Sequence, residues 1–562
     1  ISYTGYVRNW KGNSEQAQPE MVFLPEFATT LPSSNFKFAK KRMANWGRRD
    51  PQGAMEEIDV EMNVIRDFAR RVLLSEETFQ EEGNTFVNMF SGEWSGTSKL
   101  NKYDLSSMYF NYAGSIYSQN FPIIDIVMNT MLKQEESDQG RHFFRMFNGM
   151  GDDQRAASYL NGKSFEQAVL DNTLSTEVFY EMMKLKGVYL RNYINSRLSS
   201  NEFKEFMAEF TKRYQFQEVN FTRLNSEFIR KFHFNLMDFI PNWYTINSTP
   251  RFIVKGVDAD QVEVGDYTKY IVKFQVYNPT NVEGVISVNV EEGGGMFPGG
   301  PRGRRGRAAQ MESKPAKNYI IEPQKYKEIR ILCDERPSNL TINTNISQNL
   351  PSTIMQNFAK VTTTTTDTVT GIFDANATLF TFNPKEITVD NEDPGFRIIE
   401  SNQKNKLQSF FKKESEDKYK NLNFWMPPSR WTATIGVNYY GDYINSAVYK
   451  KSGSGSNKTE WTTQIQIPGF YEVFVYTSEL PMMGWRHRGG EEKKIQYYTV
   501  KHDDGEEEIS VETGRGRQGW RTLGSFYFSK GEAKITLSDK GSESNQIIFA
   551  DAVKWVYTNN NK

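Results

Sequence analysis

Residues 236–254 read LMDFIPNWYTINSTPRFIV, and the spacing of apolar residues changes within this stretch. Upstream of it, apolar residues recur at the spacing that places them on one face of an α-helix. Downstream they alternate, as Phe252 and Val254 do, which is typical of a strand. Pro241 and Pro250 hinder the continuation of a helix, because proline has no backbone N–H to donate. The sequence therefore predicts a helical half and a β-rich half that join here.

The composition indicates a folded protein of several domains. The chain has 562 residues, of which 38% are hydrophobic, so packed cores in about three or four domains are expected. Its 68 basic and 69 acidic residues nearly cancel. A neutral chain carries no global field that favours a polyanion or an anionic membrane. We therefore expect no nucleic-acid partner.

The sequence also bears on location. No apolar run approaches the roughly 20 residues that a membrane helix needs, and no signal peptide is visible. The chain opens at Ile1 rather than at methionine, so we expect a trimmed piece of a longer protein, whose preceding sequence could hold a signal, a membrane anchor or a catalytic centre. The one cysteine, Cys333, lies in an apolar run and is predicted to be a buried thiol. Low cysteine use, 14% aromatic residues and abundant Asn, Ser and Thr fit a protein that is exported to the periplasm or cell surface of a bacterium that does not rely on disulfides.

The helical half is predicted to form a domain over residues 51–249, after an irregular segment over residues 1–50. A stripe of apolar residues begins at Met55, and further helices are expected over residues 121–132, 179–190 and 224–239. Two capping boxes mark the starts of other helices: Ser164 with Gln167, and Ser199 with Glu202. After the second box, four apolar residues share one face of the predicted helix: Phe203, Phe206, Met207 and Phe210.

Residues 250–385 are predicted to form an immunoglobulin-like β-sandwich. Tyr270, Val272 and Phe274 alternate with Ile271, Lys273 and Gln275, and the Asn278-Pro279 turn follows. The sequence GGGMFPGGPRGRRGRAAQ at residues 293–310 interrupts one hairpin. Its glycines and prolines cannot pack, so a mobile loop is expected, and its arginines are interpreted as solvated rather than as a phosphate or RNA site. The overall fold class is thus α plus all-β in several domains.

Parts of the helical half resemble the zinc aminopeptidases of the gluzincin type. The similarity is carried by KGVYLRNYI, by FKEFMAEFTKRYQF and by Phe239 with Trp243, and it extends over residues 109–252. The resemblance implies a zinc ion held by HExxH and a downstream glutamate. HExxH is absent, and none of the four histidines stands four positions from another. No metal ligand or cofactor is therefore expected in this chain, and zinc would require preceding sequence. Tyr117 lies near the position of the family's transition-state tyrosine and is a weak catalytic candidate. A place in a helical core is the favoured interpretation for it.

Residues 386–562 are predicted to form a second, jelly-roll-like antiparallel β-sandwich. The ordered pieces VDNEDPGF, IPGFYEVFVY, YTVKHDDG, GWRTLGSFYF and FADAVKW resemble the golvesin C-terminal-like module. That module is similar to carbohydrate-binding domains attached to some polysaccharide lyases and to large exported bacterial proteins. The resemblance implies that Asp551 in FADAVKW satisfies a buried backbone group or a structural cation.

Aromatic residues in this module suggest a saccharide site, since a flat ring can stack on a pyranose. Trp461 and Trp555 are predicted to lie in the core, and Trp520 is assigned to the core by two to one. The glycan-binding candidates are Trp485, Arg486, Arg488, Trp520 and Tyr440.

Two functions remain open at this point. The favoured one is a non-catalytic, exported or envelope scaffold that binds a glycan or a protein through its C-terminal sandwich, because the residue set that peptidase chemistry requires is absent. The alternative is the C-terminal portion of a zinc aminopeptidase-like enzyme whose metal site precedes Ile1. A lyase is disfavoured, since no base with a set of residues to neutralise a uronate can be identified.

Overall fold

In the computed structural model, the described residues begin at Ile116 and end at Thr558, with gaps between them. The described residues are 116–118, 120, 121, 124, 127, 151–171, 173–214, 219–293, 316–358, 361, 363–400, 418–423, 426–478, 494–514, 517–543 and 545–558. The predictions for residues 1–50, for the helix that begins at Met55 and for the Gly/Arg tract at 294–310 lie outside them. The chain divides into two compact units, residues 1–138 with 162–247 and residues 139–161 with 248–562.

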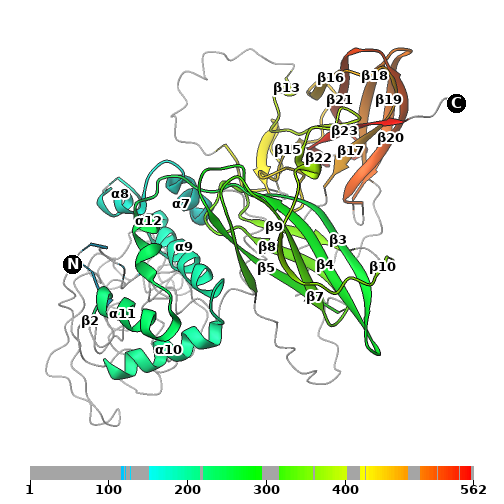
Figure 1. Ribbon diagram of the computed structural model, residues 1–562. Helices are drawn as coiled ribbons and strands as arrows, with labels where there is room; N and C mark the ends of the chain where they lie inside the picture. Colours follow the sequence, from blue (N-terminus) through cyan, green and yellow to red (C-terminus); the bar gives the residue numbers. More distant parts are fainter. Residues whose placement is uncertain are drawn as a thin grey trace, which may run out of the picture. The chain divides into compact units, whose positions relative to one another are not determined.

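The first unit is mainly helical in its described part (Figure 1). Its elements are β1 (Ile116–Tyr117), α8 (Phe165–Leu170), α9 (Thr176–Asn195), α10 (Ser200–Arg213), β2 (Val219–Asn220), α11 (Phe221–Phe232), the 3-10 helix η2 (Leu236–Asp238) and α12 (Ile240–Thr245). Helix α7 (Asp152–Leu160) belongs to the second unit. Tyr117 was expected in a helical core, but its backbone forms β1, which pairs in parallel with β2. No helix in the described part of the chain is long and apolar enough to span a membrane.

Both predicted capping boxes are confirmed. The Ser164 hydroxyl accepts from the Gln167 N–H, and the Gln167 side chain accepts from the Ser164 N–H. Ser199 and Glu202 make the same reciprocal pair at the start of α10. The apolar stripe of α10 is buried as expected: Phe203, Phe206, Met207 and Phe210. A local sequence signal thus positions these helices without help from distant residues.

The single helix predicted over residues 224–239 is wrong. Helix α11 ends at Phe232, because His233 adopts the left-handed backbone conformation with φ of 54°. The chain then turns through η2 and starts α12, in which Pro241 occupies the first turn. Proline is tolerated there, since the first N–H groups of a helix have no intrahelical acceptor. Pro241 therefore opens a helix here instead of blocking one.

Lys186 is a buried amine inside the helical unit. Its Nζ donates to the Trp243 carbonyl and lies 5.2 Å from the centroid of the Trp243 ring. Burial lowers the pKa of Lys186 to about 7. The unfolded chain therefore binds a proton that the folded chain lacks between pH 7 and the ordinary lysine pKa, so the stability of this unit rises as the pH rises through that window.

We expect this rise to be about 2 to 3 kcal/mol between pH 7 and pH 9, at about 1.4 kcal/mol per pKa unit. The Lys186→Met variant keeps the apolar stem and should show a flat profile. Hydrogen exchange of α9 amides in the full chain measures the opening free energy at each pH. Lys231→Met, at a half-exposed lysine of α11, serves as the control and should keep the rise. A wild-type profile as flat as that of Lys186→Met would contradict the assignment.

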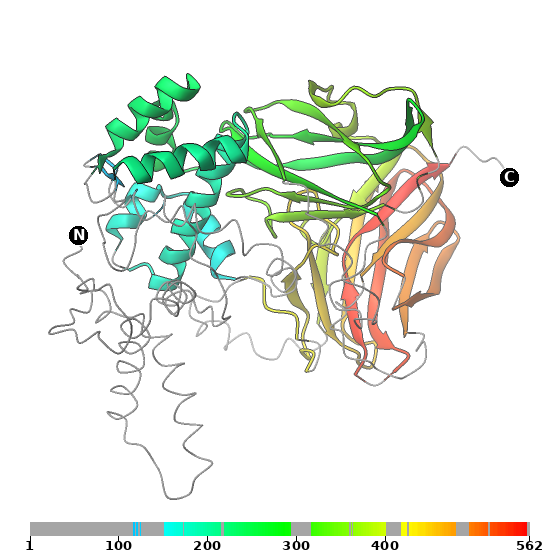
Figure 2. The ribbon, with the colours of Figure 1, turned by 90° about the horizontal axis from the view of Figure 1, so that it is seen from below.

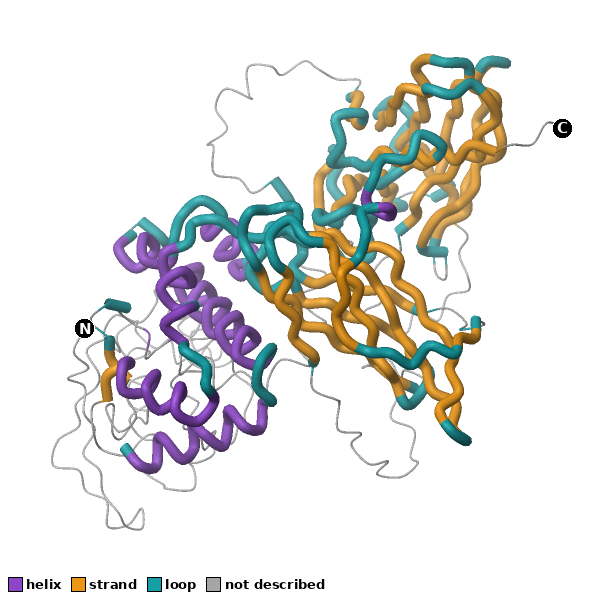
Figure 3. Tube along the Cα trace, viewed as in Figure 1, coloured by secondary structure: helices purple, strands orange, loops and turns teal. Residues whose placement is uncertain are grey.

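The second unit consists mainly of strands (Figure 3), and most of the strand pairs are antiparallel. Its first sandwich contains a five-stranded sheet in the order β10-β3-β4-β7-β11 and a four-stranded sheet in the order β6-β5-β8-β9. The strands are β3 (Ile253–Val264), β4 (Tyr267–Tyr277), β5 (Gly284–Glu292), β6 (Lys317–Ile321), β7 (Tyr326–Cys333), β8 (Pro337–Asn343), β9 (Thr353–Asn357), β10 (Thr364–Thr365) and β11 (Gly371–Asp374). Val272 and Phe274 of one sheet share a buried core with Ile286 and Val288 of the other, and Cys333 is buried there as predicted.

The C-terminal module follows a 3-10 turn, η3 (Thr378–Phe380). Three sheets build it, in the orders β12-β23-β17-β20, β13-β16-β21-β18-β19 and β14-β15-β22. The strands are β12 (Glu386–Val389), β13 (Phe396–Ile399), β14 (Thr432–Ile435), β15 (Ser446–Lys451), β16 (Lys458–Ile465), β17 (Gly469–Thr477), β18 (Lys494–His502), β19 (Gly505–Thr513), β20 (Gly519–Phe528), β21 (Gly531–Gly541), β22 (Ile547–Ala550) and β23 (Val553–Thr558). The last strand, red in Figure 2, lies between β12 and β17. Trp461 and Trp555 are buried in the shared core, as predicted.

Candidate functional site

Three aromatic side chains meet at one end of the β12-β23-β17-β20 sheet. Tyr476 of β17 and Trp520 of β20 are direct partners in the strand register, and their ring centroids lie 5.3 Å apart, edge to face. Tyr440, from the segment before β15, packs against both, with centroids 5.1 Å from Trp520 and 5.7 Å from Tyr476. All three residues are partly exposed, and burial raises the pKa of the Tyr440 and Tyr476 hydroxyls. We call Tyr440, Tyr476 and Trp520 the aromatic cluster.

A lysine adds charge beside these rings. Lys554 of β23 has its Nζ 4.6 Å from the Trp520 centroid and 5.6 Å from that of Phe474. Glu386 of β12 accepts from the same Nζ at 3.4 Å. A lysine over an aromatic face is attracted by the ring quadrupole. The aromatic cluster thus lies beside one hydrogen-bond donor and one carboxylate acceptor, which are carried on β23 and β12 of the same sheet.

Tyr440 is held in place by its backbone. Its N–H donates to both carboxyl oxygens of Asp551, at 3.3 and 3.2 Å, and the Ser478 hydroxyl donates to the same carboxyl at 3.0 Å. The Trp461 indole donates to the backbone carbonyl of Asp551 at 3.0 Å. Asp551 thus satisfies the backbone N–H of Tyr440, which agrees with one of its two predicted roles. This carboxyl connects the aromatic cluster with the core of the module.

A second carboxyl lies close to Asp551. Burial, followed by repulsion from Asp551, raises the pKa of Asp390 to about 9. Burial also raises the pKa of Asp551 well above its ordinary value. Two neighbouring carboxyl groups that are both desolvated cannot easily ionise together. In the described part of the chain, no group of three or more His, Cys, Asp or Glu side chains is arranged to hold a metal ion.

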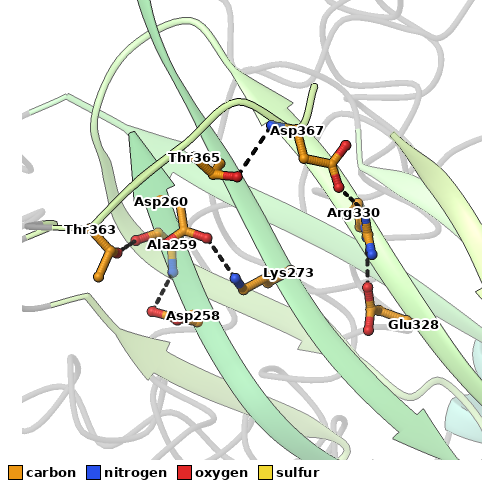
Figure 4. Close-up of polar contacts among 9 residues, drawn as sticks. All are labelled: Asp258, Ala259, Asp260, Lys273, Glu328, Arg330, Thr363, Thr365 and Asp367. Carbon is orange, nitrogen blue, oxygen red and sulfur yellow. Dashed lines mark hydrogen bonds and ion pairs between the residues drawn. The ribbon is translucent and has the colours of Figure 1, made fainter. Parts of the chain in front are cut away.

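The other polar network of note lies on the first sandwich (Figure 4). Asp260 of β3 pairs with Lys273 of β4 at 2.5 Å, and Arg330 of β7 pairs with Glu328 and with Asp367. The first pair joins the neighbouring strands β3 and β4, whereas Glu328 and Arg330 both lie on β7 and Asp367 lies after β10. Most of these side chains are partly exposed. Ion pairs of this kind each contribute about 1 kcal/mol or less. The network holds the segment around Asp367 to the sheet, and its charges are already paired with each other.

The structure brings two of the predicted site residues together and does not describe three others. Tyr440 and Trp520 come into contact, although nothing in the sequence showed that they would meet. Trp520 was assigned to the core, but it lies partly exposed on the outer face. Three candidates lie outside the described residues: Trp485, Arg486 and Arg488. The sequence interpretation missed Tyr476 and Lys554, and the alternation of β17 was the available signal, because Tyr471, Val473 and Val475 face inward and Tyr476 does not.

Comparison with protein families finds a match for this module. The Golvesin C-terminal domain model matches residues 420–557, so this part of the chain is similar to that domain. Strands β12 and β13 precede the matched residues but pair with β23 and β16, respectively. The structural module therefore begins before the family match. No curated protein matches the chain at a significant level.

Solved structures show only distant likeness. A Paenibacillus xanthan lyase is 14% identical with a TM-score of 0.22, and the match covers 55% of this chain and 26% of that one. A family 35 carbohydrate-binding module from Clostridium thermocellum is 13% identical with a TM-score of 0.19, covering 30% of this chain and 98% of that one. A two-domain protein from Bacteroides fragilis is 9% identical with a TM-score of 0.14, covering 55% and 94%. The chain thus spans about a quarter of the length of the xanthan lyase. None of these comparisons supports the aminopeptidase resemblance.

Proposed function

We propose that this chain is a non-catalytic carbohydrate-binding protein, and that the aromatic cluster is its binding site. One observation carries the proposal. Three aromatic rings from separate parts of the C-terminal module converge at a partly exposed position, beside one amine and one carboxylate that can bond sugar hydroxyls. This combination of ring surface and few convergent polar groups is typical of small-ligand sites.

The chemistry of each group fits a pyranose. The apolar C–H face of a sugar ring packs against aromatic surface, as other apolar groups do. The Lys554 ammonium donates to hydroxyl oxygens, and Glu386 accepts from hydroxyl protons. The buried network around Asp551 keeps Tyr440 in position, so little ordering is needed when the ligand binds. We also infer that the protein acts outside the cell or in the bacterial envelope, where a polysaccharide ligand is available.

The Trp520→Ala variant tests the site. We expect its affinity for a polysaccharide to fall at least tenfold, or about 1.4 kcal/mol, because the central ring of the cluster is lost. Affinity electrophoresis of the full chain measures retardation by hydroxyethylcellulose, galactomannan, xanthan and polygalacturonate. Tyr267→Ala is the matched control, since Tyr267 is a 74% exposed aromatic residue on the first sandwich. If none of these polymers retards the wild-type chain, or if Trp520→Ala binds as the wild type does, the proposal is wrong.

The aminopeptidase alternative has a separate requirement. It needs HExxH and a downstream glutamate in sequence that precedes Ile1. Tyr117, its weak catalytic candidate here, has its backbone in β1. No contact of the described residues favours peptide hydrolysis, so carbohydrate binding is the function that the site supports best.

A further inference from the structure

We propose that the binding site extends along β17 and β20 to a second aromatic pair, Phe470 with Tyr527, and that this face takes an uncharged linear polysaccharide along its length. The inference rests on the proposed function and specifies its ligand. It assigns a role to two exposed aromatic residues that the fold does not need in its core.

The second pair lies at the opposite end of the same two strands. Phe470 and Tyr527 are direct partners in the register of β17 and β20, and their ring centroids lie 5.4 Å apart, edge to face. Phe470 is 38% exposed and Tyr527 is 37% exposed. Large aromatic residues in a strand normally bury most of their surface. This pair repeats the edge-to-face arrangement of Tyr476 with Trp520.

Both pairs lie on one face of the sheet. Along β17, Tyr471, Val473 and Val475 are fully buried, so the residues between them point the other way. Phe470 and Tyr476 are therefore on the same outer face. They stand six positions apart along β17, which is about 20 Å at roughly 3.3 Å per residue. A single sugar ring cannot span that length, whereas an extended chain of sugars can contact both pairs.

The residues between the pairs are mixed in polarity. The strand register places Glu472 opposite Ser525, and Phe474 opposite Thr522 and Lys554. Protein interfaces instead have a continuous apolar centre with a polar rim. Rings spaced by hydroxyl and charged groups suit a ligand whose own surface alternates between C–H faces and hydroxyls. We therefore favour a glycan over a protein partner for this face.

The charges on this face decide between neutral and acidic polysaccharides. Lys554 is paired with Glu386, so the two charges nearly cancel. Glu472 lies on the same face, between the two aromatic pairs, and accepts a hydrogen bond from the Thr522 hydroxyl at 3.5 Å. Within the described part of the chain, Glu472 makes no ion pair. An anionic polymer along this path would approach an uncompensated carboxylate. An uncharged polymer would not be repelled, and its hydroxyls can donate to Glu472.

The test compares three proteins in affinity electrophoresis: wild type, Trp520→Ala, and the double variant Phe470→Leu/Tyr527→Leu. Leucine keeps apolar bulk on the strands while removing both rings, and thermal unfolding checks that the double variant is folded. We expect hydroxyethylcellulose or galactomannan to retard the wild type, and both variants to bind that polymer at least tenfold more weakly. Tyr267→Ala should bind as the wild type does. Xanthan and polygalacturonate should give little retardation.

Failure of this inference can be told from failure of the proposed function. If Trp520→Ala loses binding but the double variant keeps it, the extended site is wrong and the aromatic cluster remains the binding site. Retardation by the acidic polymers alone would overturn the uncharged ligand. No retardation of the wild type by any of the four polymers would overturn both proposals. A self-association of the wild type that the double variant loses would show that the second pair is a protein contact.

Discussion

Replacement of Lys450 by alanine is expected to destabilise the C-terminal module by about 3 to 5 kcal/mol. Lys450 of β15 and Asp539 of β21 form an ion pair in which both side chains are almost completely buried. Removing the amine would leave Asp539 as a buried carboxylate without its counter-charge. The loss of one partner of such a pair costs far more than the net contribution of the intact pair.

The surroundings of Asp539 show why it stays ionised. Burial acts to raise the pKa of this carboxyl, but hydrogen bonds from Lys450 and Asn457 outweigh burial and lower the pKa below its ordinary value. The Gly455 N–H adds a third donor at 2.7 Å. A carboxyl whose pKa is lowered by folding stabilises the folded state above its unfolded pKa, and this contribution is lost as the pH falls through the folded pKa. The module should therefore lose this stabilisation only in acid.

Hydrogen exchange of β15 and β21 amides in the full chain measures the effect of Lys450→Ala at neutral pH. Lys269→Ala is the control, because Lys269 pairs with a largely exposed Asp334 and its loss should cost about 1 kcal/mol or less. A Lys450→Met/Asp539→Leu double variant removes both charges and should recover much of the lost stability. Equal losses of stability in Lys450→Ala and Lys269→Ala would rule out the buried pair as a major contributor to the stability of the C-terminal module.

Local signals in the sequence were sufficient for several parts of the fold. The capping boxes at Ser164 and Ser199 depend only on residues three positions apart, and both are present. Trp555 stands at an alternating position of the apolar strand β23, and Trp461 is one of two large apolar residues in the otherwise polar strand β16; both tryptophans are buried. The helix expected through His233 failed, because a left-handed backbone at one residue ends the helix without changing the apolar spacing.

The candidate site could be predicted only in part. Tyr440 and Trp520 were named as separate candidates, but their contact depends on which strands pair and in which register. That register also shifts between Val473 and Phe474, so counting residues along β20 would have placed Trp520 on the wrong face. Lys554 reaches the rings only because β23 lies beside β17. Contacts between segments that are far apart in the chain leave no periodic pattern in the sequence.

Asp390→Asn is expected to stabilise the C-terminal module relative to the wild type, by about 4 kcal/mol more at pH 8 than at pH 5. The pKa of Asp390 is raised to about 9 by burial and by the neighbouring Asp551. The folded chain therefore holds a proton that the unfolded chain has lost, and the stability from this group is complete below the unfolded pKa and falls as the pH rises toward 9.

Asparagine matches the shape of the protonated carboxyl and cannot ionise, so Asp390→Asn should flatten the fall in stability between pH 5 and pH 8. Hydrogen exchange of β12 and β23 amides in the full chain gives the opening free energy at both pH values. Asp503→Asn is the matched control, because hydrogen bonds from Ser529 lower the pKa of that exposed carboxyl, and its replacement should bring no gain at pH 8. If Asp390→Asn destabilised the module at pH 8, Asp390 would have to be ionised and paired in the folded protein.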